Sequence, residues 1–309
     1  MKILLATDGS RHSELAAKTL IALKPPSDAE VFIMHVMESP HYLITPVVPP
    51  PYNVEWHRVQ HELQVEAEEA ATLAVEQAEQ IVTNTGLGIH SIVGEGYPAN
   101  EIIDKAKEIG ADLTVVGSRG LTASALFMLG SVSQKVIKYA PCSVLLTKPA
   151  MQPDEPRVAR VILATDGSEN AKEAARFLSS FQLADDAEII LLNVVHQLRG
   201  ISRSAQSTME QIRQSRLEDS QRLLQDTQNY LNTGAKVTTS IREGDPTEQI
   251  LQASSEKNAD LIVVGSKGLS GIKMFLLGSV SQRVCRYSDR SVLLVKMRHE
   301  SPSSSEGHL

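Results

Sequence analysis

The sequence predicts two tandem α/β domains, each a doubly wound, Rossmann-like sheet of five parallel strands. Two observations lead to this fold class. Short apolar runs alternate with longer segments of helical periodicity, which is the pattern of buried parallel strands joined by helices. The whole series then occurs twice in 309 residues, so each half has the usual length of one domain.

Each expected element follows from a local pattern. The strands are apolar runs bounded by glycine, proline or polar residues, and Gly86 and Gly110 stand where helix C-caps are expected. In the first half we expect strands at 3–6, 31–36, 90–93, 113–116 and 144–146, and helices at 14–23, 57–82, 100–109 and 132–139. In the second half we expect strands at 161–164, 189–194, 236–241, 261–264 and 292–295, and a long charged helix at 204–231.

The internal repeat fixes the domain organisation. Residues 117–148 and 265–296 are identical at 18 of 32 positions, with an offset of 148, whereas the two N-terminal segments match with an offset of 158. We therefore expect domains at 1–149 and 157–298, joined by the proline-rich linker at 149–156. The polar tail at 298–309 has the composition of a disordered segment.

The difference in offset places an insertion in the first half, and the proline-rich segment at 40–52 is the composition break that fits it. This segment follows the second expected strand. It is interpreted either as a lid over the first site or as a plain surface insertion, which loops tolerate well.

A spaced motif, Gly-x2-Gly-x9-Gly-Ser, occurs once in each half. The copies are Gly117, Gly120, Gly130 and Ser131, and then Gly265, Gly268, Gly278 and Ser279. Glycines let the backbone approach a ligand closely, and the free N–H groups of a helix N-terminus attract anions. Because ligands of doubly wound sheets bind beyond the carboxyl ends of the strands, the motif predicts a site for the ribose and phosphates of a nucleotide.

Part of this pattern also has explanations that need no ligand. The segments 131–134 and 279–282 fit a capping box. Asp8 and Asp166 follow the first strand of each half and fit an Asx turn, or equally a contact with a base, a ribose or a phosphate-bound Mg²⁺. Capping does not explain the first two glycines of each motif.

On these residues the chain resembles the universal stress protein family, and in particular its tandem-domain, nucleotide-binding members, over nearly its whole length. The motif marks the members of that family that bind ATP. The resemblance therefore implies two potential ATP sites, with ADP or AMP as alternatives and Mg²⁺ held through the phosphates.

The resemblance also implies the residues of both sites. In the first half these are Asp8 and Val36 at the adenine, Gly117, Arg119 and Gly120 at the ribose and α-phosphate, and Gly130, Ser131, Val132 and Ser133 at the β- and γ-phosphates. The matching set in the second half is Asp166, Val194, Gly265, Lys267, Gly268, Gly278, Ser279, Val280 and Ser281. At Val194 the match is imperfect, because Asn193 stands where the first half has His35.

Members of the family often pair through their last strands, so the resemblance implies that 143–148 and 291–296 pair within this chain. Such a pairing would make the chain a pseudo-dimer. A further homodimer is left open.

Bulk properties bear on the partners and the compartment. A formal charge of −7 and a sequence pI of about 5.8 disfavour nucleic-acid binding, which needs clustered positive charge. No apolar run approaches the roughly 20 residues of a membrane span, and the N-terminus lacks a signal-peptide pattern. Two non-equivalent cysteines fit a reducing, cytoplasmic compartment. His57 and His61 have a metal-binding spacing without a third ligand, and no metal site is assigned.

Three functions follow from these observations. The first is a cytoplasmic, ATP-binding stress or signalling module that an unidentified protein partner reads. The second is a slow ATPase or a nucleotidyl or phosphoryl transferase; the sequence lacks a Walker A motif, and we assign no catalytic residue. The third is an interaction scaffold that needs no nucleotide.

Overall fold

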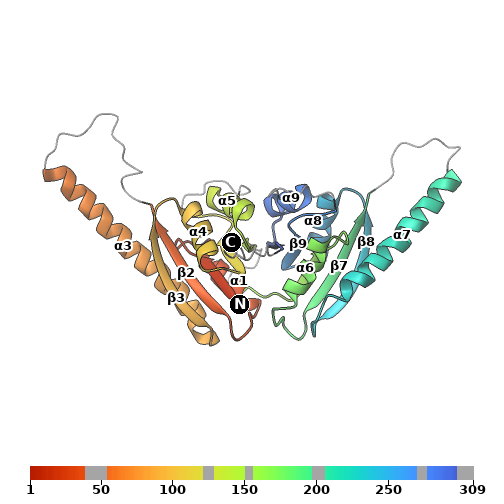
Figure 1. Cartoon of the computed structure of the whole chain (residues 1–309), viewed down its shortest axis with the longest axis horizontal. Coiled ribbons are helices and arrows are strands. Elements are labelled where there is room, and N and C mark those ends of the chain that lie inside the picture. The colour runs from red at the N-terminus through yellow and green to blue at the C-terminus, as the bar shows by residue number, and fades with distance from the viewer. Residues whose placement is uncertain (39–53, 121–128, 150–155, 197–205, 270–276, 298–309) are drawn as a thin grey trace, which may run out of the picture.

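The computed structural model describes residues 1–38, 54–120, 129–149, 156–196, 206–269 and 277–297 (Figure 1). The expected insertion at 40–52, most of the linker and the tail lie outside these residues. The predictions made for those three segments stay predictions.

All the expected strands and helices are present, with ends that differ by a few residues. The first half contains β1 (Lys2–Ala6), α1 (Arg11–Ala22), β2 (Glu30–Met37), α3 (Val54–Val82), β3 (Gly88–Glu95), α4 (Pro98–Glu108), β4 (Leu113–Gly117), α5 (Ser131–Tyr139) and β5 (Ser143–Thr147). The second half contains β6 (Arg160–Ala164), α6 (Glu169–Leu178), β7 (Glu188–Val195), α7 (Gln206–Gln228), β8 (Lys236–Glu243), α8 (Pro246–Glu256), β9 (Leu261–Gly265), α9 (Ser279–Tyr287) and β10 (Ser291–Val295).

The early start of helix α1 has a clear cause. Helix α1 begins three residues before the expected start, because Ser10 is its N-cap and its side chain accepts a hydrogen bond from the Ser13 N–H. The capping box expected at 131–134 is wrong. The N-cap of α5 is Gly130, and no described side chain makes a capping hydrogen bond there. The capping box expected at 279–282 is wrong for the same reason, because the N-cap of α9 is Gly278.

The two five-stranded sheets join into one sheet of ten strands in the order β3-β2-β1-β4-β5-β10-β9-β6-β7-β8. Within each half all pairs are parallel. Strands β5 and β10 are antiparallel, with Leu145 opposite Leu293. The doubly wound fold and the internal pairing of the last strands are therefore both confirmed.

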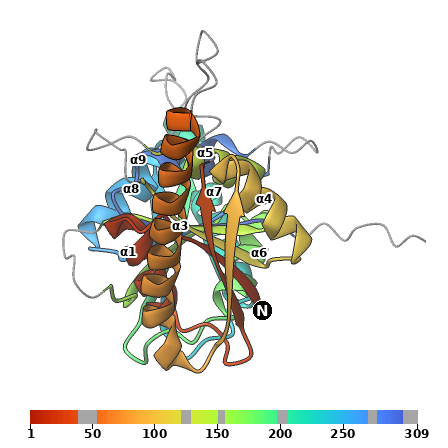
Figure 2. The same cartoon turned by 90° about the vertical axis from the view of Figure 1, so that its left-hand side faces the viewer.

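Helices cover both faces of the sheet. Helices α1, α3, α6 and α7 pack on one apolar cluster, and α4, α5, α8 and α9 pack on the other. Successive strand residues alternate between the clusters, as the two-residue period of a strand requires: Ile3 and Leu5 face one, Leu4 and Ala6 the other. Figure 2 shows α1 and α4 on opposite sides of the first-half strands.

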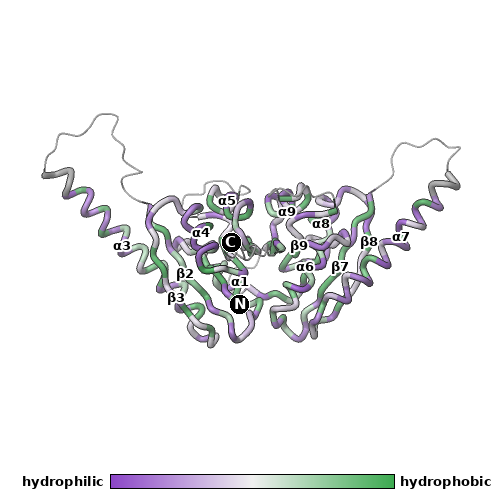
Figure 3. Tube along the Cα trace, viewed as in Figure 1, coloured by the Kyte–Doolittle hydropathy of each residue, from purple (hydrophilic) through white to green (hydrophobic). Residues whose placement is uncertain are grey.

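The halves are arranged as a pseudo-symmetric pair, with α3 and α7 at the two outer ends and α5 and α9 near each other at the centre (Figure 1). Apolar residues concentrate on the strands, and hydrophilic ones are prominent on the outer helices (Figure 3). Among the described helices, none combines the length and apolar character needed to cross a membrane.

Candidate functional site

The strand order places a crevice where the motif residues lie. Strand β1 pairs with β2 on one side and with β4 on the other, so the order reverses at the β1–β4 pair. The chain leaves β1 toward α1 and β4 toward α5, which lie on opposite faces of the sheet. Doubly wound sheets bind their ligands beyond the carboxyl ends of the two strands at which the order reverses.

A cavity of about 580 Å³ occupies this place, and we call it the motif cavity. All nine residues predicted for the first site line it: Asp8, Val36, Gly117, Arg119, Gly120, Gly130, Ser131, Val132 and Ser133. Its volume falls in the range of pockets that hold drug-sized ligands, about 300–1,000 Å³.

One end of the motif cavity is an uncapped helix N-terminus. The first backbone bond of α5 runs from the Gln134 N–H to the Gly130 carbonyl oxygen at 2.9 Å, so the amides of the preceding turn have no partner within the helix. Helices α1, α6 and α8 differ, because the side chains of Ser10, Ser168 and Asp245 cap them. Helix α5 therefore presents its amide donors and the positive end of its dipole to the cavity.

The first two glycines of the motif serve close packing. A Cβ on Gly117 would lie 2.9 Å from the His12 carbonyl carbon and oxygen, in the first turn of α1. A Cβ on Gly120 would lie 2.6 Å from Asp8 Oδ2. Neither residue has a positive φ angle, so the turn needs these glycines for space and not for a left-handed backbone. Sequence reasoning assigned them to a sharp turn and to the approach of a ligand, and missed this packing against α1 and Asp8.

Asp8 organises the loops around the cavity. Its Oδ1 accepts a hydrogen bond from the Ser10 N–H at 3.0 Å, which confirms the Asx turn. The equivalent Asp166 accepts from the Ser168 N–H at 3.1 Å and, through Oδ2, from the Leu269 N–H at 3.0 Å. In the second half the aspartate thus ties the glycine turn to the end of the first strand.

Ser133 has a structural bond as well. Its side chain is buried, and Oγ donates to the Gly117 carbonyl oxygen at 2.7 Å, which holds the first turn of α5 against the end of β4. Ser281 donates in the same way to the Gly265 carbonyl oxygen at 2.8 Å. Because these hydroxyl protons are engaged, any hydrogen bond from Ser133 or Ser281 to a phosphate would come from the backbone N–H.

Part of the lining of the motif cavity is apolar. Met34, Val36, Ile102 and Val116 line it, from β2, α4 and β4. Such a wall suits a planar ring. Sequence reasoning found Val36 but missed Met34, although the two-residue period of β2 places both on one face.

His35, which precedes Val36 in β2, also lines the motif cavity. Burial lowers the pKa of His35, and its Nδ1 is buried without a hydrogen-bond partner among the described residues. In the second half the equivalent Asn193 is buried, and its Nδ2 donates to the Thr165 carbonyl oxygen at 2.7 Å. The two sites therefore differ chemically at this position.

The second half otherwise repeats the geometry. Helix α9 has Gly278 as its N-cap and no side-chain cap, and a Cβ on Gly268 would lie 2.4 Å from Asp166 Oδ2. The predicted residues lie at the carboxyl ends of β6, β7 and β9 or at the start of α9: Asp166, Val194, Gly265, Lys267, Gly268, Gly278, Ser279, Val280 and Ser281.

No group of three or more His, Cys, Asp or Glu side chains suited to a metal ion occurs in the part of the chain that the structure describes. The side chain of His57 lies outside that part, so the His57–His61 spacing is not tested.

Comparison with known proteins shows which family the sequence matches. The model of the universal stress protein family matches residues 1–148 and again residues 158–296. A universal stress protein of Methanocaldococcus jannaschii is 38% identical over 147 residues, which cover 48% of this chain and 81% of that protein. A universal stress protein of Mycolicibacterium smegmatis is 28% identical over 303 residues, covering 96% of this chain and 97% of its own.

A solved structure also matches over the full length. The crystal structure of a universal stress protein from Archaeoglobus fulgidus has a TM-score of 0.61 and 22% sequence identity, and the match covers 96% of this chain and 98% of that one. At 22% identity the match shows the fold alone.

Proposed function

Since the chain belongs to the universal stress protein family, we propose that it is a nucleotide-dependent stress and signalling module whose motif cavity binds ATP. The observation that carries the proposal is the first turn of α5, which no described side chain caps and which opens into a cavity that also has an apolar wall. A triphosphate needs the first of these features and a base needs the second.

The residues of the cavity have distinct roles in this proposal. The amides of Ser131, Val132 and Ser133 would hold the β- and γ-phosphates, as helix N-termini hold anions. Arg119 would approach the α-phosphate, and Val36 would pack on the adenine. Bound Mg²⁺ would neutralise phosphate charge and would be held through the phosphates. ADP or AMP would fill the same cavity in part.

The second half would form an equivalent site at the start of α9. Lys267 replaces Arg119 there, and Asn193 replaces His35. We expect these two exchanges to make the affinities of the two sites unequal.

The module would act as a switch rather than as an enzyme. Asp8 and Glu38 are the acidic residues among the described lining of the motif cavity, and Asp8 already accepts the Ser10 N–H in the Asx turn. Slow hydrolysis or group transfer is the alternative, and hydrolysis measured over hours separates it from stable binding. We place the module in the cytoplasm, where the free thiols of Cys142 and Cys285 would stay reduced.

The Gly130→Asp variant tests the proposal at the first site. A Cβ on Gly130 would meet its nearest neighbour, the Ser118 carbonyl oxygen, at 3.4 Å, and the φ angle of −63° suits any residue. An aspartate at an N-cap accepts the amide hydrogens of the first helical turn. The new carboxylate would therefore satisfy α5 and exclude phosphate from the same donors.

Gly234→Asp is the matched control, because it makes the same charge change where a Cβ would meet nothing within 4 Å. We expect Mg-ATP to raise the melting temperature of the wild type and of Gly234→Asp, and to raise that of Gly130→Asp less. An unchanged response in Gly130→Asp, or no response and no co-purified nucleotide in the wild type, would refute ATP binding in this cavity.

A further inference from the structure

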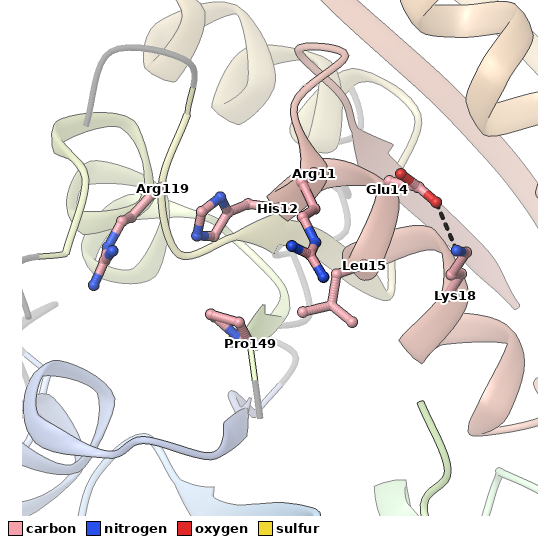
Figure 4. Close-up of a pocket in the computed structure, with 7 residues that line it drawn as sticks. All are labelled: Arg11, His12, Glu14, Leu15, Lys18, Arg119 and Pro149. Atoms are coloured by element: carbon pink, nitrogen blue, oxygen red, sulfur yellow. Dashed lines mark ion pairs between the residues drawn. The ribbon is translucent and has the colours of Figure 1, made fainter. Parts of the chain in front are cut away.

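A second cavity, of about 650 Å³, lies beside the first turns of α1 and the end of β5. We call it the basic cavity. Seven of the described residues line it: Arg11, His12, Glu14, Leu15, Lys18, Arg119 and Pro149. Figure 4 shows the His12 ring between Arg119 and Arg11 in that view, with Pro149 nearby. Arg119 also lines the motif cavity, so one side chain is common to both.

The lining carries more positive than negative charge. Arg11 and Lys18 come from α1 and Arg119 comes from the turn after β4, whereas Glu14 is the one carboxylate among the described residues of the lining. Glu14 is already paired with Lys18, at 2.6 Å between Oε1 and Nζ. Guanidinium groups match the oxygens of a phosphate in geometry as well as charge. This local excess occurs in a chain whose formal charge is −7.

His12 adds a group that responds to an anion. Its Nε2 is buried without a hydrogen-bond partner among the described residues. Burial lowers the pKa of His12, Arg119 and Arg11 lower it further, and only Asp8 opposes them. The ring is therefore neutral near pH 7, and an anion seated beside it would favour the protonated form.

Comparison with the second half shows that the fold does not require the positive charge of Arg11 at this position. The residues equivalent to Arg11 and His12 are Glu169 and Asn170. There Lys172 pairs with both Glu169 and Asp226 at 3.2 Å. An acid and an amide thus stand in the second half where the first half has Arg11 and His12.

We propose that the basic cavity binds a dianionic phosphoryl group, as a small phosphate ester or free phosphate, through Arg11, His12 and Arg119. The cavity is far larger than a phosphate ion, and Leu15 and Pro149 give it an apolar wall for the organic part of an ester. Through Arg119, occupancy of the basic cavity also affects the motif cavity. The site itself does not depend on nucleotide binding.

The test removes competing anion sites first. In the full-length Gly130→Asp/Gly278→Asp protein, carboxylates occupy the amide donors of α5 and α9, so phosphate bound there is excluded. Calorimetric titrations of this protein use inorganic phosphate and phenyl phosphate as separate probes. Tighter binding of phenyl phosphate identifies an ester as the ligand, and equal binding identifies free phosphate.

The decisive variant adds Arg11→Glu and His12→Asn, the residues that the second half carries at the same positions. We expect at least about a tenfold loss of affinity for either probe, the size of one charge-assisted hydrogen bond. The control Lys107→Glu makes the same charge reversal on an exposed residue of α4 and should leave the affinity unchanged. Absence of binding before these changes, or equal binding after them, would overturn the proposal.

A pH series separates protonation of His12 from attraction of the anion by the two arginines. Sulfate serves as the probe, because its charge stays constant over the range. Sulfate affinity in the Gly130→Asp/Gly278→Asp background should rise as the pH falls and His12 takes up a proton. His12→Asn alone should flatten this rise, and an unchanged profile would contradict the assignment of His12.

Discussion

At the scale of single residues, the glycines of the motif do two separate things. Gly117 and Gly120 allow close approach to α1 and to Asp8, whereas Gly130 begins a helix whose first amides stay uncapped. The motif therefore combines two packing requirements with one binding feature. One sequence pattern can therefore indicate both how the loops pack and where a ligand binds.

Gly120→Ala tests the packing role. Its new Cβ would lie 2.6 Å from Asp8 Oδ2, so the turn or the aspartate must move. We expect the free energy of unfolding to fall by about 1–3 kcal/mol, the usual cost of overpacking. Denaturant unfolding measures it, with Gly234→Ala as the control because its Cβ would meet nothing within 4 Å. Equal stability of the two variants would show that Gly120 is not needed for packing.

At the scale of elements, the sequence predicted the strands well because each is a short apolar run between polar or glycine boundaries. It could not show which glycines face a neighbouring backbone, since that depends on α1 packing against β4. It also misplaced the cap of α5: Ser131 fits a capping box as a pattern, but the side chain that caps a helix depends on the path of the incoming loop. The basic cavity joins α1 with residues more than 100 positions away, which no local pattern reveals.

Helix α3 carries a prediction of its own. Its C-terminal part buries Ala71, Ala74, Val75, Ala78 and Val82, but no side chain between 58 and 70 is buried. Backbone amides at 62–70 should therefore exchange with solvent at least about tenfold faster than those at 75–82. Hydrogen exchange resolved by peptide measures this difference. Equal protection along the helix would indicate that something covers its N-terminal turns in solution.

At the scale of the whole molecule, two lysines tie the halves together. Lys148, after β5, donates through Nζ to the Ser288 carbonyl oxygen just beyond α9. Lys296, after β10, donates to the Ala140 carbonyl oxygen just beyond α5, at 2.7 Å. Lys148 of the first half thus caps the C-terminus of α9, whose N-terminus faces the proposed phosphate site of the second half. Lys296 of the second half does the same for α5 and the site of the first half.

These lysines predict a pH dependence of stability. Burial lowers the pKa of Lys148 and of Lys296 to about 8, from an ordinary value of 10.5. Between these values the unfolded chain binds more protons than the folded one, so this contribution to stability rises with pH. Relative to a Lys148→Met/Lys296→Met variant, the wild type should gain stability from about pH 8 to about pH 10.5. Unfolding free energies measure it, and a difference that does not change with pH would contradict the prediction.

The pseudo-symmetry of the molecule leads to the central claim, which is that each half binds one nucleotide at the start of α5 or α9. Calorimetric titration with Mg-ATP tests it most directly. We expect a stoichiometry near two for the wild type and for Gly234→Asp, near one for Gly130→Asp or Gly278→Asp, and no binding for the double variant. A wild type that binds no ATP, or a double variant that still binds it, would contradict the claim.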